Sequence, residues 1–80
     1  MTQVRPLPSE LQEKISFQRN VKAIRLDRDF TQEELARKIG CSESLISVWE
    51  TGLYLPSLNN LIRIAEALKC SLDELVYKGN

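Results

Sequence analysis

The chain has 80 residues, enough for one domain with a small hydrophobic core, and its hydrophobic share of 42% and charged share of 28% are those of an ordinary globular protein. Eleven basic residues balance eleven acidic ones, so net charge alone indicates neither a nucleic acid nor a membrane surface as partner. The chain has no histidine, no apolar run of membrane-spanning length and no signal segment, so we expect a cytoplasmic protein that is not an enzyme and uses no metal, cofactor or small-molecule substrate.

Residues 1–8 contain two prolines and predict an irregular N-terminal arm, followed by a single domain over residues 9–80. Ser9 and Gln12 match a capping box and predict the start of the first helix. That helix should end near Arg28, and its apolar positions recur along one face: Phe17, Val21 and Ile24. Its basic residues are read either as a solvated face or as part of a binding surface: Lys14, Arg19, Lys22, Arg25 and Arg28.

Two short helices are predicted next. Thr31 and Glu34 form a second capping box, and Gly40 should end the helix that they open. Ser42 caps the following helix, which Gly52 should end. The stretch "LYLPS" is predicted to be a loop, because Pro56 disfavours a helical residue before it.

Two further helices complete the expected all-α domain of about five helices. Ser57 caps the first of them, whose inward residues should be Leu58, Leu61, Ile64, Ala65 and Leu68. Ser71 and Glu74 form a third capping box, and the apolar side of the last helix is expected at Leu72, Leu75 and Val76. Cys41 and Cys70, which are far apart, each follow a helix end and are expected to be buried small apolar residues.

The spacing of small residues predicts a helix-turn-helix over about residues 32–51. Two short helices that cross at roughly 90–120° must approach closely, which suits the small side chain of Ala36. Gly40 suits a turn with positive φ, and Ile46 can fill the hollow at the crossing. Trp49 should close the core against the helix after the loop.

The run "TQEELARKIGCSESLISVWETG...PSLNNLIRIAEALKCSLDEL" resembles the Cro/CI-type regulators, the helix-turn-helix family of lambdoid phage repressors and Cro. The resemblance covers about Phe17 to Leu75. It implies a five-helix lambda-repressor-like DNA-binding domain, a homodimer on palindromic double-stranded DNA operators, and regulation of transcription, in particular repression, in a bacterial cytoplasm.

The third predicted helix, about residues 43–51, is expected to lie in the major groove. Its outward residues are small or polar, so they allow close approach to bases: Ser42, Glu43, Ser44, Ser47 and Val48. By resemblance, Glu43, Ser44 and Val48 match base-reading positions, and Ser42 and Ser47 match positions that contact phosphate.

The same resemblance assigns supporting roles. Gln32 should contact the DNA backbone and brace the reading helix, and Tyr54 could donate one hydrogen bond to phosphate. Glu50 should form a partly exposed pair with Arg25 that fixes this helix against the scaffold.

Three departures from the family pattern indicate modest DNA affinity and greater dependence on dimerisation. Asp29 occupies a usual glycine position, the loop "LYLPS" is uncharged where the family is often basic, and Glu43 brings an acid near phosphates. Leu53 and Leu55 suggest a subunit interface. Together with Tyr54 and the apolar side of the last helix they are more hydrophobic than a monomer of 80 residues needs, which predicts a two-fold homodimer. The alternative interpretation is a protein-interaction module of the same fold, such as an antitoxin-like or bridging subunit with weak DNA binding.

Overall fold

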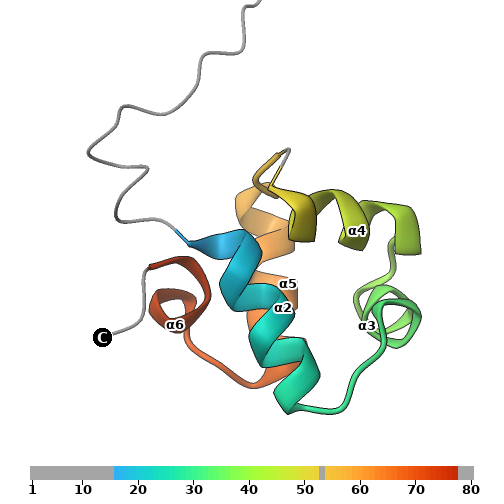
Figure 1. The fold of residues 1–80 in the computed structure, drawn as a ribbon, viewed down its shortest axis with the longest axis horizontal. Coiled ribbons are helices and arrows are strands. Elements are labelled where there is room, and N and C mark those ends of the chain that lie inside the picture. Colours follow the sequence, from blue (N-terminus) through green and yellow to red (C-terminus); the bar gives the residue numbers. More distant parts are fainter. Residues whose placement is uncertain (1–15, 53, 78–80) are drawn as a thin grey trace, which may run out of the picture.

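The computed structural model describes residues 16–52 and 54–77, which form five α-helices (Figure 1). The helices are α2 (Phe17–Asp27), α3 (Gln32–Ile39), α4 (Glu43–Thr51), α5 (Leu58–Leu68) and α6 (Leu72–Val76). The expected five-helix all-α fold is therefore confirmed for this part of the chain. The predicted arm, the helix start at Ser9, Lys14 and Leu53 lie outside the described residues. No helix in the described ranges has the length and apolar character needed to cross a membrane.

Helix α2 occupies the middle of the arrangement, with α3 and α6 on opposite sides of it (Figure 1). It packs against α4 and α6, while α3 packs against α4 and α5, and α5 also contacts α6. The largest side chains that these contacts bury completely come from all five helices: Phe17, Val21, Leu35, Ile46, Ile64, Leu68 and Leu75. One shared core therefore holds α4 in place from the side opposite to its exposed face.

Short-range hydrogen bonds start the helices where the sequence predicts. In α3, the Glu34 backbone N–H donates to Thr31 Oγ1 at 3.0 Å, and the Thr31 N–H donates to the Glu34 carboxylate at 2.9 Å. Ser71 and Glu74 form the same reciprocal pair at the start of α6. Both predicted capping boxes within the described residues are thus confirmed.

The apolar face predicted for α5 is partly wrong. Leu58 is 65% exposed, although we expected it to point inward, and Leu72 at the start of α6 is also exposed. All the residues that α5 buries lie in its second half: Ile64, Ala65, Ala67 and Leu68. The first turn of α5 therefore extends beyond the core, and helical spacing could not indicate where the neighbouring helices stop.

Two turns depend on the left-handed backbone region at residues that are not glycine. Asp29, between α2 and α3, has a φ of 61°, as expected for a residue in a usual glycine position. Lys69, after α5, has a φ of 55°, which the sequence did not predict. Gly40, between α3 and α4, has a φ of 80°, and no atom lies within 4 Å of where its Cβ would be, so its backbone conformation rather than lack of space favours glycine.

Candidate nucleic-acid interface

Helices α3 and α4 form the close pair that the sequence predicts. Ala36 is 3% exposed and Ile46 is completely buried, while Gly40 makes the left-handed turn between the two helices. The backbone N–H groups of Gly40 and Cys41 both donate to the Ala36 carbonyl oxygen at 2.9 Å. Trp49 is buried in the same core as residues of α5, although α4 as a whole packs on α2 and α3.

The surface of α4 is exposed mainly at its N-terminal end. Ser42, Glu43 and Ser44 are exposed, and Ser42 Oγ accepts a hydrogen bond from the Leu45 backbone N–H at 3.2 Å. Ser47 and Val48 are half-buried, and Val48 also packs against the core. Both were expected to be outward residues of this helix, and both are partly rather than fully exposed.

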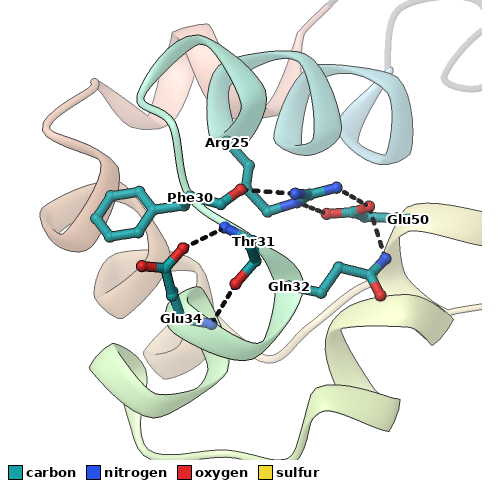
Figure 2. Close-up of polar contacts among 6 residues, drawn as sticks. All are labelled: Arg25, Phe30, Thr31, Gln32, Glu34 and Glu50. Atoms are coloured by element: carbon teal, nitrogen blue, oxygen red, sulfur yellow. Dashed lines mark hydrogen bonds and ion pairs between the residues drawn. The ribbon is translucent and has the colours of Figure 1, made fainter.

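A polar network joins α2 to the last turn of α4 (Figure 2). Arg25 Nε donates to Glu50 Oε2 at 2.6 Å, and Arg25 Nη2 donates to Glu50 Oε1 at 3.0 Å. The pair predicted from the sequence is present, but its expected partial exposure is wrong, since the Arg25 and Glu50 side chains are only 7% and 4% exposed. Arg25 Nη1 also donates to the Phe30 carbonyl oxygen at 2.7 Å, which ties the network to the turn before α3.

Gln32, the first residue of α3, completes this network. Its Nε2 donates to Glu50 Oε1 at 3.0 Å, so the Glu50 carboxylate accepts three hydrogen bonds from two helices (Figure 2). Among the described residues, no buried side-chain nitrogen or oxygen lacks a hydrogen-bond partner. A satisfied buried network of this kind fixes the orientation of α4 relative to α2 and α3.

Three further contacts near α4 were not predicted. The exposed Thr51, one turn after Ser47 and Val48, donates its hydroxyl to the Val48 carbonyl oxygen at 2.9 Å. Helical spacing places it on the same side of α4 and could have revealed it. The sequence could not indicate the hydrogen bond from Arg25 to the Phe30 carbonyl oxygen, because the acceptor is a backbone atom. Nor did any sequence pattern indicate that Gln18 packs against Gly52. Tyr54 is 64% exposed, which leaves its hydroxyl accessible.

The basic residues of α2 and of its C-cap, Arg28, divide into two groups. Arg25 is used in the buried network, and Arg28 donates from Nε to the Leu68 carbonyl oxygen at 3.0 Å and pairs with Asp27. Arg19 and Lys22 are exposed. Arg25 and Arg28 therefore serve the fold, which neither reading of the basic stretch describes, and both readings stay open for Arg19 and Lys22.

The ionisable groups with shifted pKa values lie at helix ends. The backbone N–H of Thr31, and then its hydroxyl, lower the pKa of Glu34, and Ser71 does the same for Glu74. Burial raises the pKa of the Cys41 and Cys70 thiols. Both cysteines are half-buried and pack against the core, so the prediction of small apolar residues is correct in kind but overstates their burial.

The close α3–α4 pair and its buried brace define a helix-turn-helix protein. The sequence model for the helix-turn-helix family matches residues 21–75, more than half of the chain. The chain belongs to this family, and the resemblance to Cro/CI-type regulators is confirmed.

Relatives and solved structures agree with this assignment. The chain is 44% identical over 45 residues to the cryptic phage CTXphi transcriptional repressor RstR of Vibrio cholerae. The matched stretch covers 56% of this chain and 40% of RstR. The P22 c2 repressor, solved with a synthetic operator, matches with a TM-score of 0.74 and 33% identity over 80% of this chain and 96% of that one. SinR, a master regulator for biofilm formation solved with DNA, matches with a TM-score of 0.71 and 28% identity over 75% of this chain and 97% of that one.

The match to whole proteins is partial. The chain spans 40%, 30% and 52% of the length of three curated relatives, all described as transcriptional regulators. The comparison therefore concerns the helix-turn-helix domain that these proteins share.

Proposed function

We propose that this protein is a sequence-specific DNA-binding regulator of transcription, and a repressor in particular, that acts in a bacterial cytoplasm. The observation that carries the proposal is the exposed N-terminal end of α4, on a helix held by the buried Arg25–Glu50 pair and by the half-buried Gln32. A helix that enters the major groove must present its first residues to base edges while the rest of the domain holds it rigidly. The repressors RstR and P22 c2 among its relatives and structural neighbours support the direction of regulation.

Individual residues have distinct roles in this proposal. The exposed Glu43 accepts from cytosine N4, and Ser44 donates to or accepts from a base edge. The exposed part of Val48 packs on a thymine methyl group. Ser42, Ser47 and Tyr54 contact phosphate, and Gln32 contacts phosphate from the N-terminus of α3 while its amide braces Glu50.

Dimerisation on a palindromic operator forms part of the same proposal. Four exposed apolar residues follow α4 in the loop and along the first half of α5: Tyr54, Leu55, Leu58 and Ile62. Leu58 and Ile62 are one helical turn apart, so they share a face of α5. A two-fold axis at this face pairs two identical apolar patches, and binding to two half-sites requires the two copies of α4 to lie about 34 Å apart, one turn of DNA.

Selection of bound sequences from random double-stranded DNA tests the proposal. We expect enrichment of an inverted repeat whose half-sites lie one turn apart, and binding that weakens as salt rises. A reporter gene placed behind the selected sequence should be expressed less when the protein is present. Retention of no duplex even at low salt, together with a stable heteromeric partner, would instead favour the protein-interaction module.

A further inference from the structure

Lys22 lies on the face of α2 that borders α4. Gln18, Lys22 and Arg25 are spaced i, i+4 and i+7, so they form one stripe along α2. Both ends of this stripe contact α4 or its C-cap. Gln18 packs against Gly52, where an added Cβ would lie 3.3 Å from Gln18 Cγ, and Arg25 pairs with Glu50. Lys22 stands between these two contacts, and its side chain is exposed.

The charge of Lys22 remains available for a partner. Arg25 and Arg28 are occupied by protein acceptors, whereas Lys22 takes part in none of the ion pairs formed within residues 16–52 and 54–77. The loop that follows α4, "LYLPS", contributes no cation of its own. On the α2 side of α4, Lys22 is therefore an exposed cation beside the C-terminal end of α4 that takes part in no ion pair among the described residues.

The dimensions of DNA place a phosphate near this position. The major groove is about 12 Å wide, and an α-helix with its side chains is about 10–12 Å across, so α4 fills the groove. Elements that flank α4 then lie over the sugar–phosphate strands that border the groove. A lysine ammonium on a flexible stem binds phosphate as a point charge without demanding one geometry.

We propose that Lys22 binds a DNA phosphate at the edge of the groove, on the α2 side of α4. This contact takes the place of a phosphate contact from the loop after α4, which has no charged residue. The inference rests on the proposed function, since it concerns the same DNA surface. Because phosphates carry no direct sequence information, Lys22 contributes to affinity on every duplex and leaves the base preference unchanged.

The test compares three variants with the wild type on the selected operator and on a random-sequence duplex, at several salt concentrations. Lys22→Gln removes the proposed contact, and Lys22→Arg keeps the charge. Arg63→Gln is the matched control, because Arg63 is an exposed cation on α5, which is not among the helices packed closely against α4, and it lines a groove with Lys38 and Glu66. Thermal unfolding of each variant checks that the fold is intact.

We expect Lys22→Gln to reduce the slope of log affinity against log salt by about 0.9, and to lower affinity about five- to tenfold at 0.1 M salt on both duplexes. Lys22→Arg and Arg63→Gln should keep the wild-type slope. Sequence selection with Lys22→Gln should return the wild-type consensus.

The outcomes separate this inference from the proposed function. If the wild type binds DNA and Lys22→Gln keeps its full slope, the Lys22 contact is refuted and the proposed function stands. An equal loss with Arg63→Gln would show a general charge effect and also refute the contact, as would a changed consensus in Lys22→Gln. If the wild type binds no duplex, both the proposed function and this inference fail.

Discussion

At the scale of single residues, the burial of the Arg25–Glu50 pair decides its energetic importance. A buried charge that loses its partner costs about 3–5 kcal/mol, whereas replacing both partners by apolar residues of similar volume is often nearly neutral. We therefore expect Arg25→Met and Glu50→Leu each to lower the free energy of unfolding by about that amount. The double variant should recover much of the loss. Urea unfolding of the four proteins measures the coupling.

The chain contains a matched exposed pair for comparison. Arg37 and Glu33 lie 2.8 Å apart on α3, one turn from each other, and both side chains are well exposed. A pair of this kind contributes about 0.3–0.5 kcal/mol. If the Arg25–Glu50 coupling is no larger than that of Arg37–Glu33, the buried network does not stabilise α4 as we infer.

This pair also shows what residue-level sequence analysis can and cannot provide. The resemblance identified Arg25 and Glu50 as partners although 25 positions separate them. It could not indicate their burial, which depends on how α2, α3 and α4 close around the side chains. The Phe30 carbonyl was equally hidden, because every residue carries a backbone carbonyl and only the turn selects this one.

At the scale of the helix, the two capping boxes make the free energy of unfolding depend on pH in the acid range. The hydrogen bonds from Thr31 and Ser71 hold the pKa values of Glu34 and Glu74 below their ordinary value of 4.5 in the folded protein. Between the folded and unfolded pKa values the unfolded chain binds more protons, so stability rises with pH there. We expect the stabilisation from these two caps to be fully present above about pH 5 and to be lost as pH falls through their folded pKa values.

Glu34→Gln/Glu74→Gln is the variant that tests this dependence, because glutamine can still accept the cap hydrogen bond but does not titrate. Its free energy of unfolding should change less between neutral and acid pH than that of the wild type. Identical pH profiles for the two proteins would show that the boxes do not contribute to acid sensitivity. Thr31→Ala should give an intermediate profile, since it removes one of the two hydrogen bonds that lower the pKa of Glu34.

The helix scale also separates the roles of α3 and α4 on DNA. Gln32→Ala should weaken binding to all duplexes by a similar factor, because it removes a phosphate contact and a brace of Glu50. Glu43→Gln should instead change the base preference at one position in each half-site, by about 1–3 kcal/mol, since an amide suits adenine and a carboxylate suits cytosine. Glu43→Gln should also tighten non-specific binding, because it removes a negative charge from a surface that faces the DNA phosphates.

Parallel selection with the wild type and these two variants measures both effects. Glu43 is exposed, so its substitution should leave the thermal midpoint almost unchanged and provide the clean comparison. The assignment of α4 as the reading helix is wrong if Glu43→Gln returns the wild-type consensus while Gln32→Ala alters it.

The helices themselves were largely predictable, because caps and stops are local. Thr31, Ser42, Ser57 and Ser71 all lie at the N-caps that the sequence indicates. The left-handed turn at Lys69 was not predictable, since lysine has no particular preference for that region.

At the scale of the whole molecule, local patterns predicted the fold better than they predicted its free surface. The i, i+3, i+4 pattern marked Leu58 as inward, yet no neighbouring helix among the described residues covers it. Which side of a helix is covered depends on the ends and directions of its neighbours, and periodicity carries no such information. The prediction that Leu58 points inward was wrong, and its observed exposure is part of the evidence for the proposed dimer surface.

The proposed two-fold dimer can be tested at this surface with one substitution. Leu58→Glu places two carboxylates opposite each other across the axis, and like charges in an interface cost several kcal/mol, roughly a hundredfold in the dimer dissociation constant. We expect the wild type to sediment as a dimer and Leu58→Glu as a monomer. Leu58→Glu should also bind the full operator only about as tightly as a single half-site. Leu26→Glu is the control, because Leu26 on α2 is 55% exposed but lies outside the patch, and it should remain dimeric. A wild type that stays monomeric both at high concentration and on DNA, or a Leu58→Glu variant that dimerises as well as Leu26→Glu, would rule out this interface.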